Sequence, residues 1–310
     1  MQVVARGLSA CGRPRIIAAM KNILRDSQGR VRNGWKALAF ILLLALVTVP
    51  LVVGLHQLPP AARPYVPGML LIAGSVLLAS WICVRAEGAT LASIGWNPGW
   101  RAGRQLLVGL AIGIGTLAFE ALLVWLGNGV RFASAPSLPW STLLHEAGKW
   151  LAVGVMEELM FRGYAMQRTM RGIGVPAGLA VFGVLFCVAH PLDGSMSAGM
   201  MVVAMANTFL FAVSMGVVWM RTGSLAVPIG WHMGWNWAQQ VLGFGVSGIA
   251  THGLWTPVFT GAPDWLTGGA YGLEASLVDT VVGTAILLAL VAWRPRLRLS
   301  AGGVSVAVPA

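Results

Sequence analysis

Long apolar runs separated by short polar segments dominate this sequence. Eight of the runs are long enough to be helices that cross a lipid bilayer, which requires about 20 mostly apolar residues. They cover residues 36–55, 66–84, 105–126, 142–164, 175–190, 199–220, 225–246 and 276–293. The pattern therefore predicts an all-α membrane protein, built as a bundle of about eight transmembrane helices.

The segments that flank the runs are polar and short. Residues 1–35 are rich in basic residues and show no clear period, so we expect a disordered cytoplasmic arm. This N-terminal segment is too long for an ordinary secretory signal, and no small-residue cleavage site follows it. The first apolar run is therefore predicted to be a retained transmembrane helix. Met20 is an alternative start. Residues 36–294 are expected to form one polytopic membrane domain, and residues 295–310 a short cytoplasmic tail.

Composition excludes most soluble classes. Hydrophobic residues make up 57% of the chain and charged residues only 10%, whereas a soluble domain carries about 25% charged residues. Lipid must therefore be the solvent for most of the chain. A net charge of +11 would suggest nucleic acid binding in a soluble protein, but here the basic residues lie between apolar runs and no nucleic acid partner is expected. The scattered Cys11, Cys83 and Cys187 indicate neither a disulfide framework nor a cysteine metal site.

The loop charges predict the orientation. With the N-terminus in the cytoplasm, the cytoplasmic side collects the basic arm and most other arginines, as the positive-inside rule requires. Those arginines are Arg85, Arg101, Arg104, Arg162, Arg168, Arg171, Arg221, Arg294, Arg296 and Arg298. The outer loops hold Arg63, Arg131, Asp193, Asp264 and Glu274. We expect an integral protein of a cell membrane, the inner membrane of a bacterium, with both termini cytoplasmic.

A few ionisable residues interrupt the apolar runs. A charge at the bilayer centre costs at least about 2.5–3.5 kcal/mol, so such residues face the protein interior and usually have a function. Glu157, Glu158 and Arg162 lie in the fourth run. Glu158 and Arg162 are four residues apart and can pair on one helix face, which would leave Glu157 free to act as a general base. The alternative interpretation is a salt-bridge cluster at a helix end.

Two further runs contribute polar residues. His190 ends the fifth run, and His232 and Asn236 lie four residues apart on one face of the seventh. Each has a structural interpretation by itself, as an interfacial histidine or as polar contacts between helices. Together with Glu157 they predict a hydrolytic site. Glu157 and His190 would deprotonate a water, while His232 and Asn236 would stabilise the oxyanion.

These clusters resemble the CAAX protease and bacteriocin-processing family of intramembrane endopeptidases. The family pattern is Glu-Glu-x-x-x-Arg, then Phe-x-x-x-His, then His-x-x-x-Asn, and it stands here at 157–162, 186–190 and 232–236. Residues 161–164 and 221–224 also look like the family, and the resemblance covers a catalytic core of about 140–240. It implies hydrolysis of a peptide bond in a membrane-associated or lipidated peptide or protein, with Glu157 as base. Eukaryotic relatives trim prenylated proteins, and bacterial relatives are linked to peptide processing and bacteriocin immunity.

The sequence is compatible with a zinc-dependent mechanism and with a metal-free one. The family is often described as metalloproteases, and Glu157, His190 and His232 can supply three zinc ligands with water as the fourth. The chain lacks the His-Glu-x-x-His pattern of common zinc proteases. Water activated by Glu157 without a metal uses the same residues. Non-enzymatic alternatives are a membrane immunity or scaffold protein and, less favoured, an ion transporter.

The predicted site has one geometric difficulty. On the predicted spans Glu157 and His232 lie in the cytoplasmic half, whereas His190 lies roughly 20 Å from the cytoplasmic start of its helix. The site assembles only if that helix starts later, is tilted or is displaced inward. Elsewhere, His145, Glu146 and Lys149 are expected to form an outer polar cap, with a role in substrate entry as the alternative. Glu120 is expected to face the bundle and line its cavity.

Overall fold

The computed structural model describes residues 23–59, 68–135, 139–190, 196–293, 297–300 and 303–306. Residues 1–22 of the predicted arm lie outside this part, as does half of the predicted tail. Each of the eight predicted spans contains one long helix. These helices are α2 (Asn33–Gln57), α3 (Gly68–Ala86), α4 (Trp100–Leu126), α5 (Trp140–Arg162), α7 (Val175–Ala189), α8 (Ala198–Thr222), α9 (Ala226–Leu242) and α11 (Leu277–Ala292).

The prediction of eight spans is supported only in part. Among the described residues, α2, α3, α4 and α8 are long and apolar enough to cross a membrane by themselves. Helices α7 and α11 are apolar but shorter, and α5 carries several ionisable residues. Helix α9 ends at Leu242 rather than at residue 246, because Gly243 adopts the left-handed conformation with φ 80°. An all-α membrane fold therefore fits, while the number of spans stays a prediction.

Several smaller elements were not predicted. They are helices α6 (Tyr164–Ile173) and α10 (Asp264–Thr267), the 3-10 turns η2 (Leu91–Ile94), η3 (Gly269–Tyr271) and η4 (Leu273–Ala275), and strands β1 (Val130–Ser134), β2 (Trp255–Phe259), β3 (Leu297–Ser300) and β4 (Gly303–Val306). Strand β1 pairs antiparallel with β2, and β3 with β4. The first pair joins segments more than 120 residues apart along the chain, which no local sequence pattern reveals.

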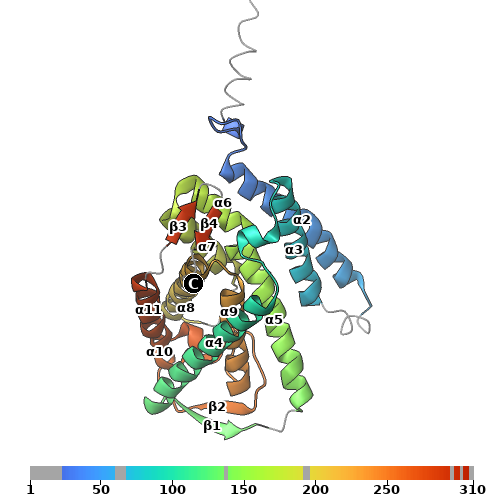
Figure 1. Cartoon of the computed structure of the whole chain (residues 1–310). Helices are drawn as coiled ribbons and strands as arrows, with labels where there is room; N and C mark the ends of the chain where they lie inside the picture. Colours follow the sequence, from blue (N-terminus) through green and yellow to red (C-terminus); the bar gives the residue numbers. More distant parts are fainter. Residues whose placement is uncertain are drawn as a thin grey trace, which may run out of the picture.

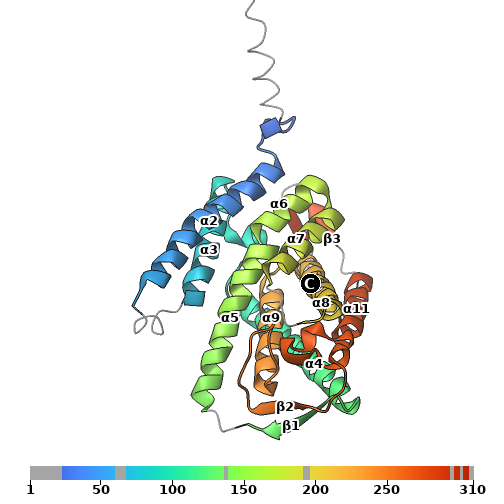
Figure 2. The ribbon, with the colours of Figure 1, turned by 180° about the vertical axis from the view of Figure 1, so that it is seen from behind.

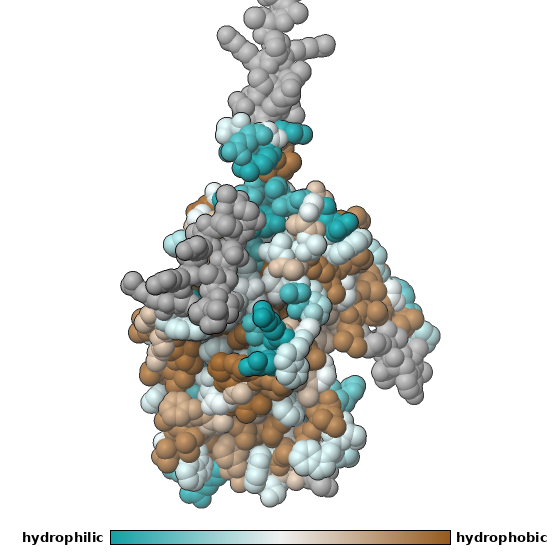
Figure 3. All heavy atoms as spheres, viewed as in Figure 1, coloured by the Kyte–Doolittle hydropathy of each residue, from teal (hydrophilic) through white to brown (hydrophobic). Residues whose placement is uncertain are grey.

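The helices form a body with two distinct ends. Helix α6 lies at the end where the chain enters from its N-terminal segment, and strands β1 and β2 lie at the opposite end (Figures 1 and 2). Helices α2 and α3 lie together on one side (Figures 1 and 2). Hydrophobic residues cover much of the lower body in Figure 3. Large apolar side chains such as Leu46, Val202 and Val281 are well exposed, as expected of a surface that faces lipid.

Helices α4 and α9 touch backbone to backbone. A Cβ atom added to Gly113 would lie 2.2 Å from the carbonyl oxygen of Trp231, and one added to Gly109 would lie 2.2 Å from that of Val227. On the opposing helix α9, a Cβ atom added to Gly230 would lie 2.1 Å from the carbonyl oxygen of Leu106. Small residues permit this close approach between membrane helices. The contact fixes α9, which carries His232 and Asn236, against its neighbour.

Glu87 joins three elements at the end of the body near α6. Its carboxylate accepts a hydrogen bond from Arg168 Nε at 3.0 Å and another from the Tyr164 hydroxyl. Lys36 Nζ of α2 lies 3.6 Å from the same oxygen. Burial raises the pKa of Glu87, but these hydrogen bonds and charges outweigh it and hold the pKa below its ordinary value of 4.5. Glu87 thus connects α2 and α6 to the segment that follows α3.

Candidate active site

A buried ion pair anchors the site on α5. Arg162 Nη1 donates to Glu158 Oε1 at 3.1 Å, and both side chains are almost completely buried. The second guanidinium nitrogen, Nη2, donates to the carbonyl oxygen of Ala212 on α8 at 3.1 Å. The guanidinium also lies 4.5 Å from the centre of the Phe186 ring of α7. The pair expected between Glu158 and Arg162 is therefore present, and Arg162 connects three helices.

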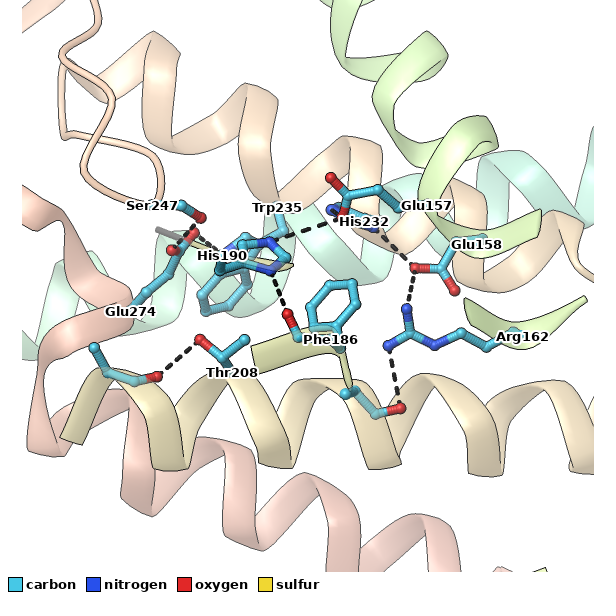
Figure 4. A network of polar contacts seen from close by, with 12 residues as sticks. Glu157, Glu158, Arg162, Phe186, His190, Thr208, His232, Trp235, Ser247 and Glu274 are labelled. Carbon is cyan, nitrogen blue, oxygen red and sulfur yellow. Dashed lines mark hydrogen bonds and ion pairs between the residues drawn. The ribbon is translucent and has the colours of Figure 1, made fainter. Parts of the chain in front are cut away.

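Glu158 in turn orients His232. His232 Nδ1 lies 2.9 Å from Glu158 Oε1. Because an ionised carboxylate can only accept, Nδ1 carries the hydrogen. The opposite ring nitrogen, Nε2, then faces Glu157 Oε2 at 3.7 Å (Figure 4). The ring of Phe211 packs edge-on against His232, with 5.2 Å between ring centres, so both the tilt and the direction of the imidazole are fixed.

His190 approaches the same carboxylate from α7. It caps the C-terminus of that helix, and its Nδ1 donates to the carbonyl oxygen of Phe186 at 2.8 Å. A carbonyl oxygen only accepts, so Nδ1 carries the hydrogen here as well. His190 Nε2 lies 3.8 Å from Glu157 Oε2. The Phe186 ring lies against His190 with 4.4 Å between centres, so one phenylalanine supports both His190 and Arg162.

Helix α6 resolves the difficulty over the position of His190. The fifth span begins at Val175 as predicted, but α6 intervenes between it and α5. Ten residues of helix span about 15 Å, and α6 carries the chain past the end of α5 before α7 turns back (Figure 1). Helix α7 therefore starts further out than its sequence position suggests. Its C-terminal end brings His190 to within 3.8 Å of Glu157, so a displacement of the helix, one of the three alternatives, allows the site to assemble.

A water can bridge these groups from the side on which the cavity lies. Distances of 3.7 and 3.8 Å exceed the range of about 2.7–3.2 Å for a direct hydrogen bond. Glu157 Oε2 is buried and accepts no hydrogen bond within the described part of the chain. A cavity of about 60 Å³ is lined by His190, His232 and Asn236, whereas one water needs about 10–15 Å³. The arrangement can therefore hold a water that bridges the carboxylate and the histidines.

The same three side chains provide a donor set that zinc accepts. Each Nε2 that faces Glu157 belongs to a ring whose Nδ1–H is held by a carboxylate or a carbonyl, the usual support of a metal-binding histidine. Glu157 Oε2 is a buried oxygen without a donor in the described residues. The separations of 3.7 and 3.8 Å exceed the value of about 3.4 Å between tetrahedral zinc ligands. Zinc would thus require a small closing movement, and as the side chains stand no described group of three has a metal-binding arrangement.

All six predicted site residues lie in or against this cluster. Asn236 lines the cavity one turn after His232, and Glu120 lines it too, as expected. His145, Glu146 and Lys149 do not join the cluster; Glu146 pairs with Lys149 at 2.8 Å near the other end of α5. Two acidic residues of the cavity wall, Glu274 and Asp279, were not predicted from the sequence. Asp279 interrupts an apolar run just as Glu120 does, and that signal could have found it.

Comparison with known proteins matches the segment that carries this cluster. The family model described as type II CAAX prenyl endopeptidase Rce1-like matches residues 137–238. This segment contains Glu157, Glu158, Arg162, His190, His232 and Asn236. No curated protein matches the chain. The resemblance drawn from the three motifs is confirmed, since the segment that builds the site matches the model of the Rce1-like type II CAAX prenyl endopeptidases, a family of proteases.

Proposed function

We propose that the chain is an intramembrane endopeptidase that hydrolyses a peptide bond in a membrane-associated or lipidated peptide or protein. The observation that carries this proposal is the convergence of Glu157 Oε2 with Nε2 of both His190 and His232, at 3.8 and 3.7 Å, beside a cavity. Membership in a protease family supports it. So does the cost of keeping such groups among apolar helices without a function.

The proposed reaction starts from a water between Glu157 and His190. Glu157 accepts a proton from this water while His190 Nε2 accepts its second hydrogen bond, so that the oxygen is aimed at the peptide carbonyl carbon. As the carbon–oxygen bond forms, the carbonyl oxygen becomes an oxyanion. Asn236 donates to it through its amide, and His232 donates through Nε2 in the doubly protonated form, whose charge lies beside Glu157 and Glu158. Glu157 then passes its proton to the departing nitrogen and the carbon–nitrogen bond breaks.

A metal would use the same residues. Glu157, His190 and His232 would hold a zinc ion, which when bound supplies a Lewis acid and a more acidic water. Metal analysis of the purified protein separates the two versions of the mechanism. Stoichiometric zinc, with cleavage lost on chelation and restored by zinc alone, favours the metal version. Full cleavage by zinc-free protein favours water activated by Glu157.

The central test is cleavage by purified protein in lipid nanodiscs, measured on fluorogenic lipidated peptides. Glu157→Gln is expected to lower kcat by about 10²–10⁴-fold, the usual contribution of a general base. Glu146→Gln is the matched control, since Glu146 lies on the same helix but pairs with Lys149 away from the cavity, and it should cleave like the wild type. Full activity of Glu157→Gln would refute the assigned base. Absence of cleavage by every form would favour a scaffold or immunity protein.

A further inference from the structure

A second group of carboxyl side chains lines the cavity. Glu120 of α4, Glu274 of η4 and Asp279 of α11 share its wall with His190 and His232. Among the described residues no lysine or arginine lines this cavity. Of the side chains that line it, only the two histidines can carry a positive charge, and His232 faces Glu157 and Glu158 instead. Burying carboxyl groups in this way is costly unless a partner compensates them.

Glu274 is held firmly in place by neutral donors. Its Oε1 accepts from Gln239 Nε2 at 2.7 Å and from Trp235 Nε1 at 3.3 Å, and its Oε2 accepts from Ser247 Oγ at 2.7 Å. Asn207 also donates to the Glu274 carbonyl oxygen at 2.9 Å. Figure 4 draws Glu274 on the far side of His190 from Glu157. Because all these donors are uncharged, the carboxylate is positioned but its negative charge is not cancelled.

Glu120 and Asp279 form a carboxyl pair beside it. The Glu120 side chain is completely buried, and neither of its oxygens accepts a hydrogen bond from a donor in the described part of the chain. Its carboxyl group instead contacts that of Asp279. Two carboxyl groups can lie together only if they share a proton or hold a cation between them. Glu120 and Asp279 both line the cavity, so a cation that enters it can take the place of the shared proton.

We infer that this end of the cavity is a subsite for a cationic side chain of the substrate, a lysine or an arginine close to the scissile bond. The inference rests on the proposed endopeptidase function. An ammonium group supplies three donors and a guanidinium five, enough to bridge Glu120, Asp279 and Glu274. The aromatic walls formed by Phe211 and Trp235 suit the aliphatic stem and attract the charge.

The geometry limits where the cationic residue stands. Trp235 and Gln239, which both contact Glu274, follow His232 on α9 by three and seven residues. At about 1.5 Å per residue this places Glu274 roughly 5–10 Å along the helix from His232. An extended peptide advances about 3.3–3.6 Å per residue. The cationic side chain is therefore expected within about three residues of the cleaved bond.

Matched peptides test the inference in two independent assays. A lipidated peptide series carries lysine at each of three positions on either side of the scissile bond, and a second series carries norleucine, which has a similar stem without the charge. Binding is measured by fluorescence anisotropy on Glu157→Gln protein in nanodiscs, and kcat/KM on protein with Glu157 intact. At one position lysine should bind at least 10-fold more tightly than norleucine. In the Glu120→Gln/Asp279→Asn variant this ratio should approach one, whereas Glu146→Gln should keep it.

The outcomes separate the subsite from the catalysis. Equal binding of lysine and norleucine at every position would overturn the subsite, as would a lysine preference that survives the double substitution; the acids would then be a neutral pair that only joins α4 to α11. A lysine preference without any cleavage would keep the subsite and reject the endopeptidase. Both substitutions keep side-chain shape, and their melting temperatures are checked first. Glu274→Gln, outside the long helices, gives the same test if the double variant does not fold.

Discussion

Among the residues that the structure describes, Arg162 is the largest fully buried side chain, and Glu158 forms an ion pair with it. Glu158 accepts from Arg162 and from His232 at the same oxygen. The orientation of the catalytic candidate His232 therefore depends on an ion pair that contacts no solvent. Removing one member of a buried pair leaves an uncompensated charge and costs about 3–5 kcal/mol.

Arg162→Gln should accordingly lower the melting temperature in detergent strongly and abolish cleavage. The matched control is Arg171→Gln on the neighbouring α6, where the arginine is exposed, and this variant should melt like the wild type. Adding Glu158→Gln to Arg162→Gln should recover part of the stability, because the lone buried charge is then removed. A melting temperature of Arg162→Gln equal to that of the wild type would contradict this account.

Glu87 gives the chain an expected acid sensitivity. Burial raises its pKa, but the hydrogen bonds from Arg168 and Tyr164 lower the pKa by more than burial raises it. The pKa in the folded protein therefore lies below 4.5. The carboxylate therefore adds stability above its unfolded pKa, and that stability is lost as the pH falls through the lower folded value. Melting temperature measured from pH 7 to pH 3 should fall in this acidic range. Glu87→Gln should have a lower melting temperature at pH 7 and a smaller decrease of that temperature toward pH 3. If its melting temperature decreases as much as that of the wild type, other groups cause the acid sensitivity.

At the scale of elements, the closest contact in the site's framework is that between α4 and α9. Gly113 and Gly230 each leave no space for a methyl group, because the opposing backbone lies 2.2 and 2.1 Å from the Cβ position. Gly115, also on α4, has nothing within 4 Å of that position. Replacing each of these two α4 glycines by alanine therefore separates the effect of the contact with α9 from the effect of helix propensity.

Gly113→Ala and Gly230→Ala should each destabilise the folded protein by about 1–3 kcal/mol, the usual cost of overpacking. They should also lower kcat, since α9 must shift and carries His232 and Asn236. Gly115→Ala should be neutral or slightly stabilising. Thermal melting and cleavage of each variant in nanodiscs check the prediction. Equal behaviour of Gly113→Ala and Gly115→Ala would show that the two helices separate easily.

The long helices and the site residues could be predicted from the sequence, whereas the segments that connect the helices could not. Glu157, His190 and His232 were recognisable because ionisable side chains in apolar runs are costly. The same reasoning should have found Asp279. Glu274 was out of reach, because a residue of an apparent outer loop reaches the cavity only through contacts with Gln239 and Ser247. Helix α6 was missed for a similar reason, since its polar residues resembled a cytoplasmic loop.

For the whole molecule, the expected orientation places α6 in the cytoplasm and strands β1 and β2 outside. Single cysteines test this in a variant in which Cys11, Cys83 and Cys187 are replaced. Gln28→Cys and Asp264→Cys are suitable because both residues are exposed, near opposite ends of the body. A maleimide that cannot cross membranes should label position 264 in intact cells, and position 28 only after lysis. The reverse pattern would invert the protein, and with it the side from which substrates arrive.

The backbone contact between α4 and α9 also restricts how a substrate can enter. A space of about 60 Å³ admits a few waters, whereas binding pockets for organic ligands measure about 300–1,000 Å³. The cavity must therefore expand before a peptide fits. Two of its walls, α4 and α9, are in direct backbone contact and cannot easily separate. The motion that admits a peptide is expected to be one-sided, with α7, α8 and α11 moving away from a stationary pair that keeps His232 and Asn236 in register.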